Sequence, residues 1–278
     1  MTQVSAGAKP DLPGLTKRVR KHIVEMTHAA QSGHPGGSLS SVEILTALYF
    51  GGILRHRPEQ PDWPDRDRFV MSKGHATPVV YGILAEAGYI DPAILPSFRQ
   101  LDTQLQGHVT RGKPPGVEMS GGALGLGLSF SNGLALAHRL DGRDSRTYCL
   151  LGDGELNEGQ NWEAAMSAAH FGFDSITAIV DRNGYQNDDL PGDEVMNLNP
   201  LPDKWAAFGW HVIEADGHNL DQMVASYEEA RQVRGRPQVI IAATQKGKGV
   251  SFMEGSGGWH GKAPNDEQLA QALEEIGA

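Results

Sequence analysis

The sequence has a single cysteine, Cys149, among 278 residues, so the chain cannot form an internal disulfide. Basic residues are also in deficit, with 24 lysines and arginines against 34 aspartates and glutamates and a formal net charge of −10. There is no basic stripe, and an acidic chain repels a phosphate backbone, which argues against a nucleic-acid-binding protein. Long apolar runs are absent too, so no membrane span is predicted. We expect a cytoplasmic protein, where thiols stay reduced.

Glycine is abundant instead, with 35 residues. Several glycines cluster where periodic segments end, which indicates close approach of the backbone to a ligand. Residues 1–11 lack the apolar centre of a signal peptide and are expected to form a disordered leader. No repeat or low-complexity linker divides the rest, so residues 12–278 are predicted to form one domain.

The order of the expected elements predicts the fold class. Apolar residues at helical spacing predict a helix over Leu12–Ala30, and Ser40 with Glu43 three residues later predicts a capping box at the start of a second helix. Further along, strand-like runs alternate with helical ones, and they lie at 145–152, 175–181, 210–215 and 237–244. This alternation predicts an α/β protein with an open, mainly parallel sheet and helices on both faces. In such sheets ligands bind at the carboxyl ends of the strands.

Two polar residues follow neighbouring strand-like runs at those ends. Asp153 and Asn183 carry hard oxygen ligands suited to Mg²⁺ or Ca²⁺, and Gly154 would let a phosphate approach the backbone. The alternative is that Asp153 caps a helix and Asn183 lies in an unrelated turn. The glycine pattern is neither a Walker motif nor G-x-G-x-x-G, so a P-loop or dinucleotide site is disfavoured.

Four of the eleven histidines stand beside glycine in expected loops: His34, His75, His108 and His260. A single loop histidine is usually only solvated. Four in similar settings could instead line a polar cleft and move protons there. No H-E-x-x-H spacing occurs, so a zinc site is not expected.

Five motifs, in this order along the chain, resemble those of transketolases. They are SGHPGGSLS, SKGHATPVVYGIL, GHVTRGKPPGVEMSGGALGLGLS, GDGELNEG with SITAIVDRNGYQ, and TQKGKGVSFMEGSGGWHGKAPN. The fourth resembles the GDG…N motif of thiamine diphosphate enzymes. The resemblance runs from about Leu12 to Asn265 and implies the thiamine diphosphate-binding fold, diphosphate domain.

The resemblance also implies how the cofactor is held. Asp153, Asn183 and the backbone carbonyl of Tyr185 would bind Mg²⁺, with Ca²⁺ or Mn²⁺ as substitutes. The metal would clamp the diphosphate of thiamine diphosphate, and the Gly154 backbone would contact that group.

The four histidines receive roles in the same way. His75 and His260 match positions beside the diphosphate, and His260 also faces the substrate. His34 and His108 match positions near the reactive carbon of the cofactor, where hydroxyls of the donor sugar bind. All four are therefore expected to be catalytic.

Three further residues match the family pattern. Gly122 and Leu124 would lie along the rings of the cofactor, and Glu158 would belong to a network that links the two active sites of a dimer. Glu155 lies where the family varies and receives no role.

The chain departs from the family in length, because it stops after the diphosphate domain. It therefore resembles the N-terminal subunit of a split transketolase, whose C-terminal partner subunit would supply the pyrimidine-binding domain in an α₂β₂ heterotetramer. The implied reaction transfers a two-carbon ketol unit from a ketose to an aldose, with sugar or sugar-phosphate substrates. The alternatives are a subunit of another split thiamine diphosphate enzyme, such as a 2-oxo acid decarboxylating synthase or dehydrogenase, and a non-catalytic structural or regulatory subunit.

Overall fold

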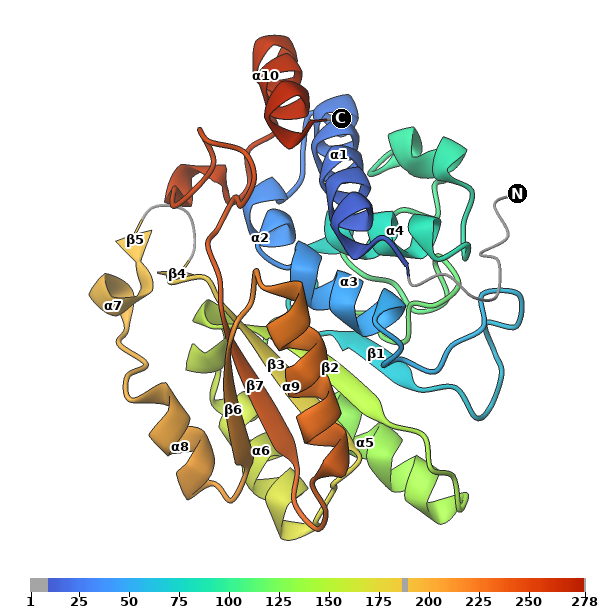
Figure 1. The fold of residues 1–278 in the computed structure, drawn as a ribbon, viewed down its shortest axis with the longest axis vertical. Helices are drawn as coiled ribbons and strands as arrows, with labels where there is room; N and C mark the ends of the chain where they lie inside the picture. Colours follow the sequence, from blue (N-terminus) through green and yellow to red (C-terminus); the bar gives the residue numbers. More distant parts are fainter. Residues whose placement is uncertain (1–9, 187–189, 278) are drawn as a thin grey trace.

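The computed structural model of the protein describes residues 10–186 and 190–277. In this part of the chain, five parallel strands form one sheet in the order β1-β2-β3-β7-β6 (Figure 1). The strands are β1 (Arg68–Met71), β2 (Thr147–Gly152), β3 (Ile176–Arg182), β6 (His211–Asp216) and β7 (Gln238–Ala243). The predicted parallel α/β sheet is confirmed. The last strand in sequence, β7, lies inside the sheet between β3 and β6.

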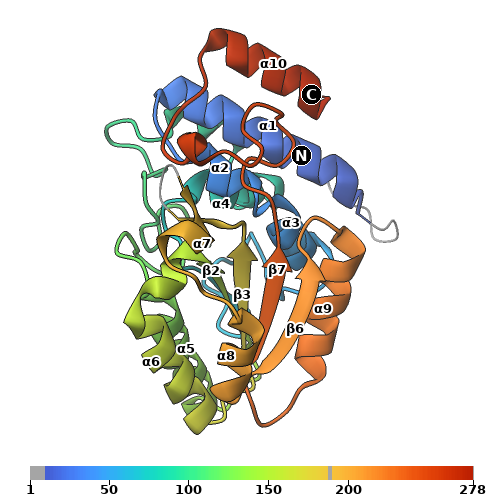
Figure 2. The ribbon, with the colours of Figure 1, turned by 90° about the vertical axis from the view of Figure 1, so that its left-hand side faces the viewer.

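Helices cover both faces of the sheet (Figures 1 and 2). One face carries α3 (Val42–Phe50) and α9 (Leu220–Gln232), and the other carries α5 (Gly127–Leu140), α6 (Gly159–His170) and α8 (Leu201–Ala207). Successive residues of a strand point to opposite faces, so Leu150 of β2 enters one core cluster while Cys149 and Leu151 enter the other. The sheet is therefore buried on both sides, as its continuous apolar strands require.

The remaining elements gather mostly at the carboxyl end of the strands, which is uppermost in Figure 2. They are α1 (Leu12–Ala30), α2 (Pro35–Leu39), α4 (Thr77–Glu86), α7 (Gly192–Val195), α10 (Asp266–Ile276), the short pair β4 (Tyr185–Gln186) and β5 (Leu190–Pro191), and the 3₁₀ turns Pro92–Ser97, Gly154–Asn157 and Gly257–Trp259. None of the helices in the described residues is long and apolar enough to cross a bilayer.

The first helix matches its prediction. The Asp11 side chain accepts the Gly14 N–H at 3.0 Å and caps α1, while Val19 and Ile23 are fully buried on its inner face. Residues 1–9 of the expected leader lie outside the described residues. The single-domain division at 12–278 stays a prediction.

The predicted capping box at Ser40 is wrong. Ser40 ends α2, and its hydroxyl donates to the Asp181 carboxylate at 2.6 Å. Helix α3 begins at Val42, and Glu43 pairs with Arg20 at 2.6 Å. Ser40 has helical φ and ψ of −64° and −25° at the end of α2, whereas an N-cap residue has a non-helical backbone, so Ser40 cannot cap α3.

Candidate functional site

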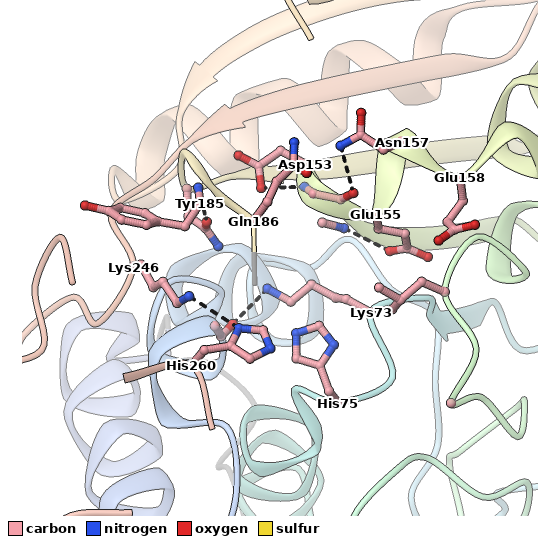
Figure 3. A pocket seen from close by; sticks show the side chains of 16 residues that line it. Lys73, His75, Asp153, Glu155, Asn157, Glu158, Tyr185, Gln186, Lys246 and His260 are labelled. Atoms are coloured by element: carbon pink, nitrogen blue, oxygen red, sulfur yellow. Dashed lines mark hydrogen bonds between the residues drawn. The ribbon is translucent and has the colours of Figure 1, made fainter. Parts of the chain in front are cut away.

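A cavity of about 310 Å³ opens at the carboxyl edge of the sheet (Figure 3). Its walls come from the segments that follow β1, β2, β3 and β7, together with α2 and the loop before α5. The predicted site residues that line it are His75, Gly122, Leu124, Asp153, Gly154, Glu158, Asn183, Tyr185 and His260. The topology thus collects residues that are far apart in sequence, as expected at the carboxyl ends of parallel strands.

Asp153 and Asn183 meet because β2 and β3 are neighbours, with Gly152 opposite Asp181. Asp153 Oδ2 accepts the Gly184 N–H at 2.7 Å, and Asn183 Oδ1 accepts the Tyr185 N–H at 3.1 Å. Asp153 also caps the short turn that follows it, so the capping role and a place in the cavity belong to the same residue.

The charge of Asp153 is poorly compensated by the protein. Burial and the nearby charge of Asp181 raise the pKa of Asp153 to about 6, against backbone hydrogen bonds that lower it. A cation beside the carboxylate would reverse this effect, because it favours the ionised form. No cluster of three or more His, Cys, Asp or Glu side chains suited to a metal occurs within the described ranges. A cation here would therefore need amide, carbonyl or ligand oxygens as well.

A buried ion pair lies beside Asp153. The Lys73 ammonium donates to the Gly37 carbonyl at 2.8 Å, to Ser41 Oγ at 3.0 Å and to the Asp181 carboxylate. Burial opposes ionisation of Asp181, but the charge and hydrogen bond of Lys73 outweigh it and hold the pKa below its usual value. We call Lys73, Asp181, Ser40, Ser41 and Thr244 the Lys73–Asp181 cluster, because all three hydroxyls also donate to Asp181.

The four predicted histidines come together. The ring of His34 lies 5.1 Å from the rings of both His75 and His260, and 6.2 Å from the ring of His108. His75 and His260 are also 5.1 Å apart. Burial, followed by the positive charge of Lys73, holds the pKa of His75 well below its usual value. His75 is therefore neutral at physiological pH and can both donate and accept a proton.

Opposite charges face each other across the cavity. Figure 3 shows Asp153 and Glu158 on one wall and Lys73, Lys246 and His260 on the other. Lys246 is buried, and its ammonium lies 3.3 Å from His260 Nδ1. The cavity can therefore hold a ligand that carries both an anionic group and a cation.

Comparisons with known proteins agree with this geometry. Residues 14–278 match the family described as transketolase, thiamine diphosphate binding domain. The chain is 41% identical over 261 residues to one subunit of the apulose-4-phosphate transketolase of Phocaeicola vulgatus, and the match covers 94% of this chain and 92% of the relative. The chain belongs to the transketolase family.

Other members of the transketolase family support the same assignment. A 6-deoxy-6-sulfo-D-fructose transketolase subunit from a Clostridium species is 41% identical over 266 residues, covering 96% of each chain. A crystal structure of a transketolase variant from Pichia stipitis superposes with a TM-score of 0.90 at 30% identity. That superposition covers 96% of this chain and 40% of the yeast chain, so this transketolase homologue spans about two fifths of the longer protein. The predicted family, fold and N-terminal subunit are confirmed.

Sequence reasoning missed Glu155 of this transketolase homologue. Its buried carboxylate accepts the Ser72 hydroxyl, the Gly125 N–H at 2.8 Å and the Gly152 N–H at 3.0 Å. These hydrogen bonds connect the ends of β1 and β2 to the loop that precedes α5. Nothing in the sequence around Glu155 distinguishes it from the exposed Glu158, because its partners come from distant segments.

Proposed function

We propose that this chain binds the diphosphate of thiamine diphosphate through Mg²⁺ and forms a transketolase together with a second subunit. One observation carries the proposal: Asp153 lies across a single cavity from Lys73, Lys246 and His260. A diphosphate with its cation presents both signs of charge, so each wall finds a partner.

The residues of the cavity fit such a group. Asp153, Asn183 and the carbonyl of Tyr185 are proposed to hold Mg²⁺, with Ca²⁺ or Mn²⁺ as substitutes, since these are hard oxygen ligands. Gly37 leaves room for the anion: a Cβ atom there would lie 3.7 Å from both Lys73 Nζ and His75 Nε2. Gly154 is proposed to contact the diphosphate through its backbone, as expected where a turn opens a helix.

Of the four histidines, His75 and His260 line the cavity and are proposed to lie beside the diphosphate, whereas His34 and His108 do not line it and are proposed to act further along the cofactor, near its reactive carbon. His34, His75, His108 and His260 would orient sugar hydroxyls and move protons during transfer of the two-carbon unit, because an imidazole can serve both tasks. When bound, thiamine diphosphate supplies the electron sink for breaking the carbon–carbon bond. Gly122 and Leu124 would lie along its rings.

A second subunit with a pyrimidine-binding domain is proposed to complete the enzyme as an α₂β₂ assembly. Two relatives that match this chain over nearly their whole length are named as transketolase subunits. Glu158 is exposed at the cavity rim and is proposed to belong to the network that links the two active sites. The one cysteine is buried and free, in keeping with a cytoplasmic enzyme.

The cofactor site is tested by Asp153→Ala in the complex of both subunits. Thiamine diphosphate binding is titrated by calorimetry with MgCl₂ and again with EDTA. We expect tight, Mg²⁺-dependent binding for the wild type and weak binding for the variant in either buffer. Asp62→Ala, at an exposed position, is the matched control and should behave like the wild type. Normal affinity in Asp153→Ala would show that the metal site is misplaced.

The reaction is tested by assaying the same complex with ketose donors, phosphorylated and not, and with 2-oxo acids. Transfer of a ketol unit to an aldose supports the proposal. Turnover of 2-oxo acids alone would identify another split thiamine diphosphate enzyme. Cofactor binding without turnover of either class would identify a structural or regulatory subunit.

A further inference from the structure

A second cavity, of about 470 Å³, lies at the opposite edge of the sheet. Its walls come from the end of α5, the segments that precede β2 and β3, and the end of α9. These are amino ends of strands, at the bottom of Figure 1, whereas the cofactor cavity lies at the carboxyl ends. We call this the amino-edge cavity.

The amino-edge cavity is strongly basic in a chain that is acidic as a whole. Five arginines line it, with two aspartates; the arginines are Arg139, Arg143, Arg146, Arg231 and Arg234. Neither aspartate forms an ion pair with a lining arginine within the described residues: Asp144 pairs with Arg55 at 2.8 Å, and Asp174 Oδ2 accepts the Gly235 N–H at 2.9 Å.

Most of the arginine charge is left without a carboxylate. Arg143 contacts Asp141 at 3.2 Å, but the other four lining arginines form no ion pair within the described residues. Arg139 donates to the carbonyls of Phe171 and Gly172, both at 2.8 Å, and Arg146 donates to Gln238 Oε1 at 2.8 Å. Neutral carbonyls fix the direction of a guanidinium but leave its charge in place.

Two buried polar atoms in the wall also lack partners. Ser145 and His138 are only 1% and 6% exposed, and Ser145 Oγ and His138 Nδ1 have no hydrogen-bond partner in the structure. Such atoms are rare in proteins, because an unpaired buried polar group destabilises the fold. These two atoms are covered, so the groups that can reach a ligand in the cavity are the guanidinium groups, and several of them around one space are donors suited to a phosphate group.

We propose that the amino-edge cavity binds a small phosphate-bearing anion. Its volume lies within the range of about 300–1,000 Å³ common for sites that bind small molecules, so it can hold a phosphate ester as well as inorganic phosphate. The site is separate from the cofactor cavity, and the inference does not depend on the proposed function.

The test uses the full chain with thiamine diphosphate and MgCl₂ present, so that the cofactor cavity is filled. Inorganic phosphate, glycerol 3-phosphate and AMP are titrated by calorimetry at constant ionic strength. We expect saturable binding with one site per chain, weakened about tenfold or more in Arg231→Ala/Arg234→Ala. Both arginines are exposed, so this variant should fold. Tighter binding of an ester would identify a phosphorylated metabolite as the ligand, and equal binding of all three would identify the phosphate group alone.

Lys17→Ala/Lys21→Ala is the control, because it removes the same charge from α1 and should bind like the wild type. A second readout is the NMR signal of the His138 ring, which should shift on addition of phosphate in the wild type. The proposal is overturned if none of the three anions binds, if both double variants weaken binding equally, or if the His138 signal stays fixed while an anion binds.

Discussion

Replacing Lys73 by methionine tests how the cofactor cavity is built. Lys73 is 1% exposed, and its ammonium has three partners: the Gly37 carbonyl, Ser41 Oγ and Asp181. Methionine keeps the length and apolar volume of the side chain but removes the charge. Asp181, which is fully buried, would then hold an uncompensated carboxylate.

Removing one partner of a buried ion pair costs about 3–5 kcal/mol. Three hydroxyls, from Ser40, Ser41 and Thr244, still donate to Asp181, so we expect the lower end of that range, about 3 kcal/mol. The double variant Lys73→Met/Asp181→Asn buries no charge and should lose only about 1–2 kcal/mol.

The assay is urea unfolding of the wild type, both single variants and the double variant, followed by tryptophan fluorescence. In Lys73→Met the folded-state pKa of Asp181 should rise above its unfolded value, so protonation should shrink the loss of stability as the pH falls. Lys17→Met, at an exposed position, should change the free energy of unfolding by less than about 0.5 kcal/mol. A loss below about 1 kcal/mol in Lys73→Met, or strictly additive effects in the double variant, would refute the reasoning.

Three further predictions concern stability and reactivity. Burial raises the pKa of Glu43, but its hydrogen bond to His218 and the charge of Arg20 lower it further, so the folded-state pKa lies below the unfolded value near 4.5. Ionised Glu43 therefore stabilises the fold above pH 4.5, and this stabilisation is lost as the pH falls through the folded-state pKa. The free energy of unfolding of Glu43→Gln should therefore fall less steeply than that of the wild type from about pH 5 to 3, and parallel curves would contradict this. In urea unfolding, Gly247→Ala should lower the free energy of unfolding by about 2 kcal/mol more than Gly52→Ala. Both glycines have a positive φ (79° and 78°), but only at Gly247 would a Cβ atom meet a backbone atom, at 2.2 Å. Equal losses in the two variants would contradict this geometry. Burial raises the pKa of the Cys149 thiol, so a thiol reagent should label it only after unfolding, and prompt labelling of the native protein would show that the strand is accessible.

The sequence predicts the elements of the fold well, because their patterns are local. The spacing of apolar residues in Leu12–Ala30 is that of a helix with one buried face, and α1 has those bounds. Continuous apolar runs mark the buried strands, as at β2 and β3. Once the strands are parallel, the residues after them must share one edge, which is why Asp153, His75 and His260 line one cavity.

Partners that are distant in sequence could not be predicted. Lys73 and Asp181 are separated by 108 positions, and neither has a local pattern that announces the ion pair. Ser40 has the local pattern of a helix cap, yet it ends α2 with helical φ and ψ and donates its hydroxyl to the distant Asp181. The position of β7 inside the sheet depends on the path of the connections, which local periodicity does not encode.

The positive charge of the amino-edge cavity could not be predicted from the sequence either. Its basic residues come from α5, the segment before β2 and the end of α9, so no single stretch is strongly basic. The negative net charge of the chain hides a positive surface that exists only after folding.

The Lys73–Asp181 cluster has a consequence for changing the enzyme. Its five side chains form hydrogen bonds with one another, so most single replacements leave a buried donor or acceptor without a partner. A different set of residues at these positions therefore requires several replacements at once. Asn157 lines the cofactor cavity but is exposed. A library that aims at new substrates should randomise such rim positions and leave the cluster intact. Divergence between related enzymes would follow the same order, with the rim changing first and the interior last.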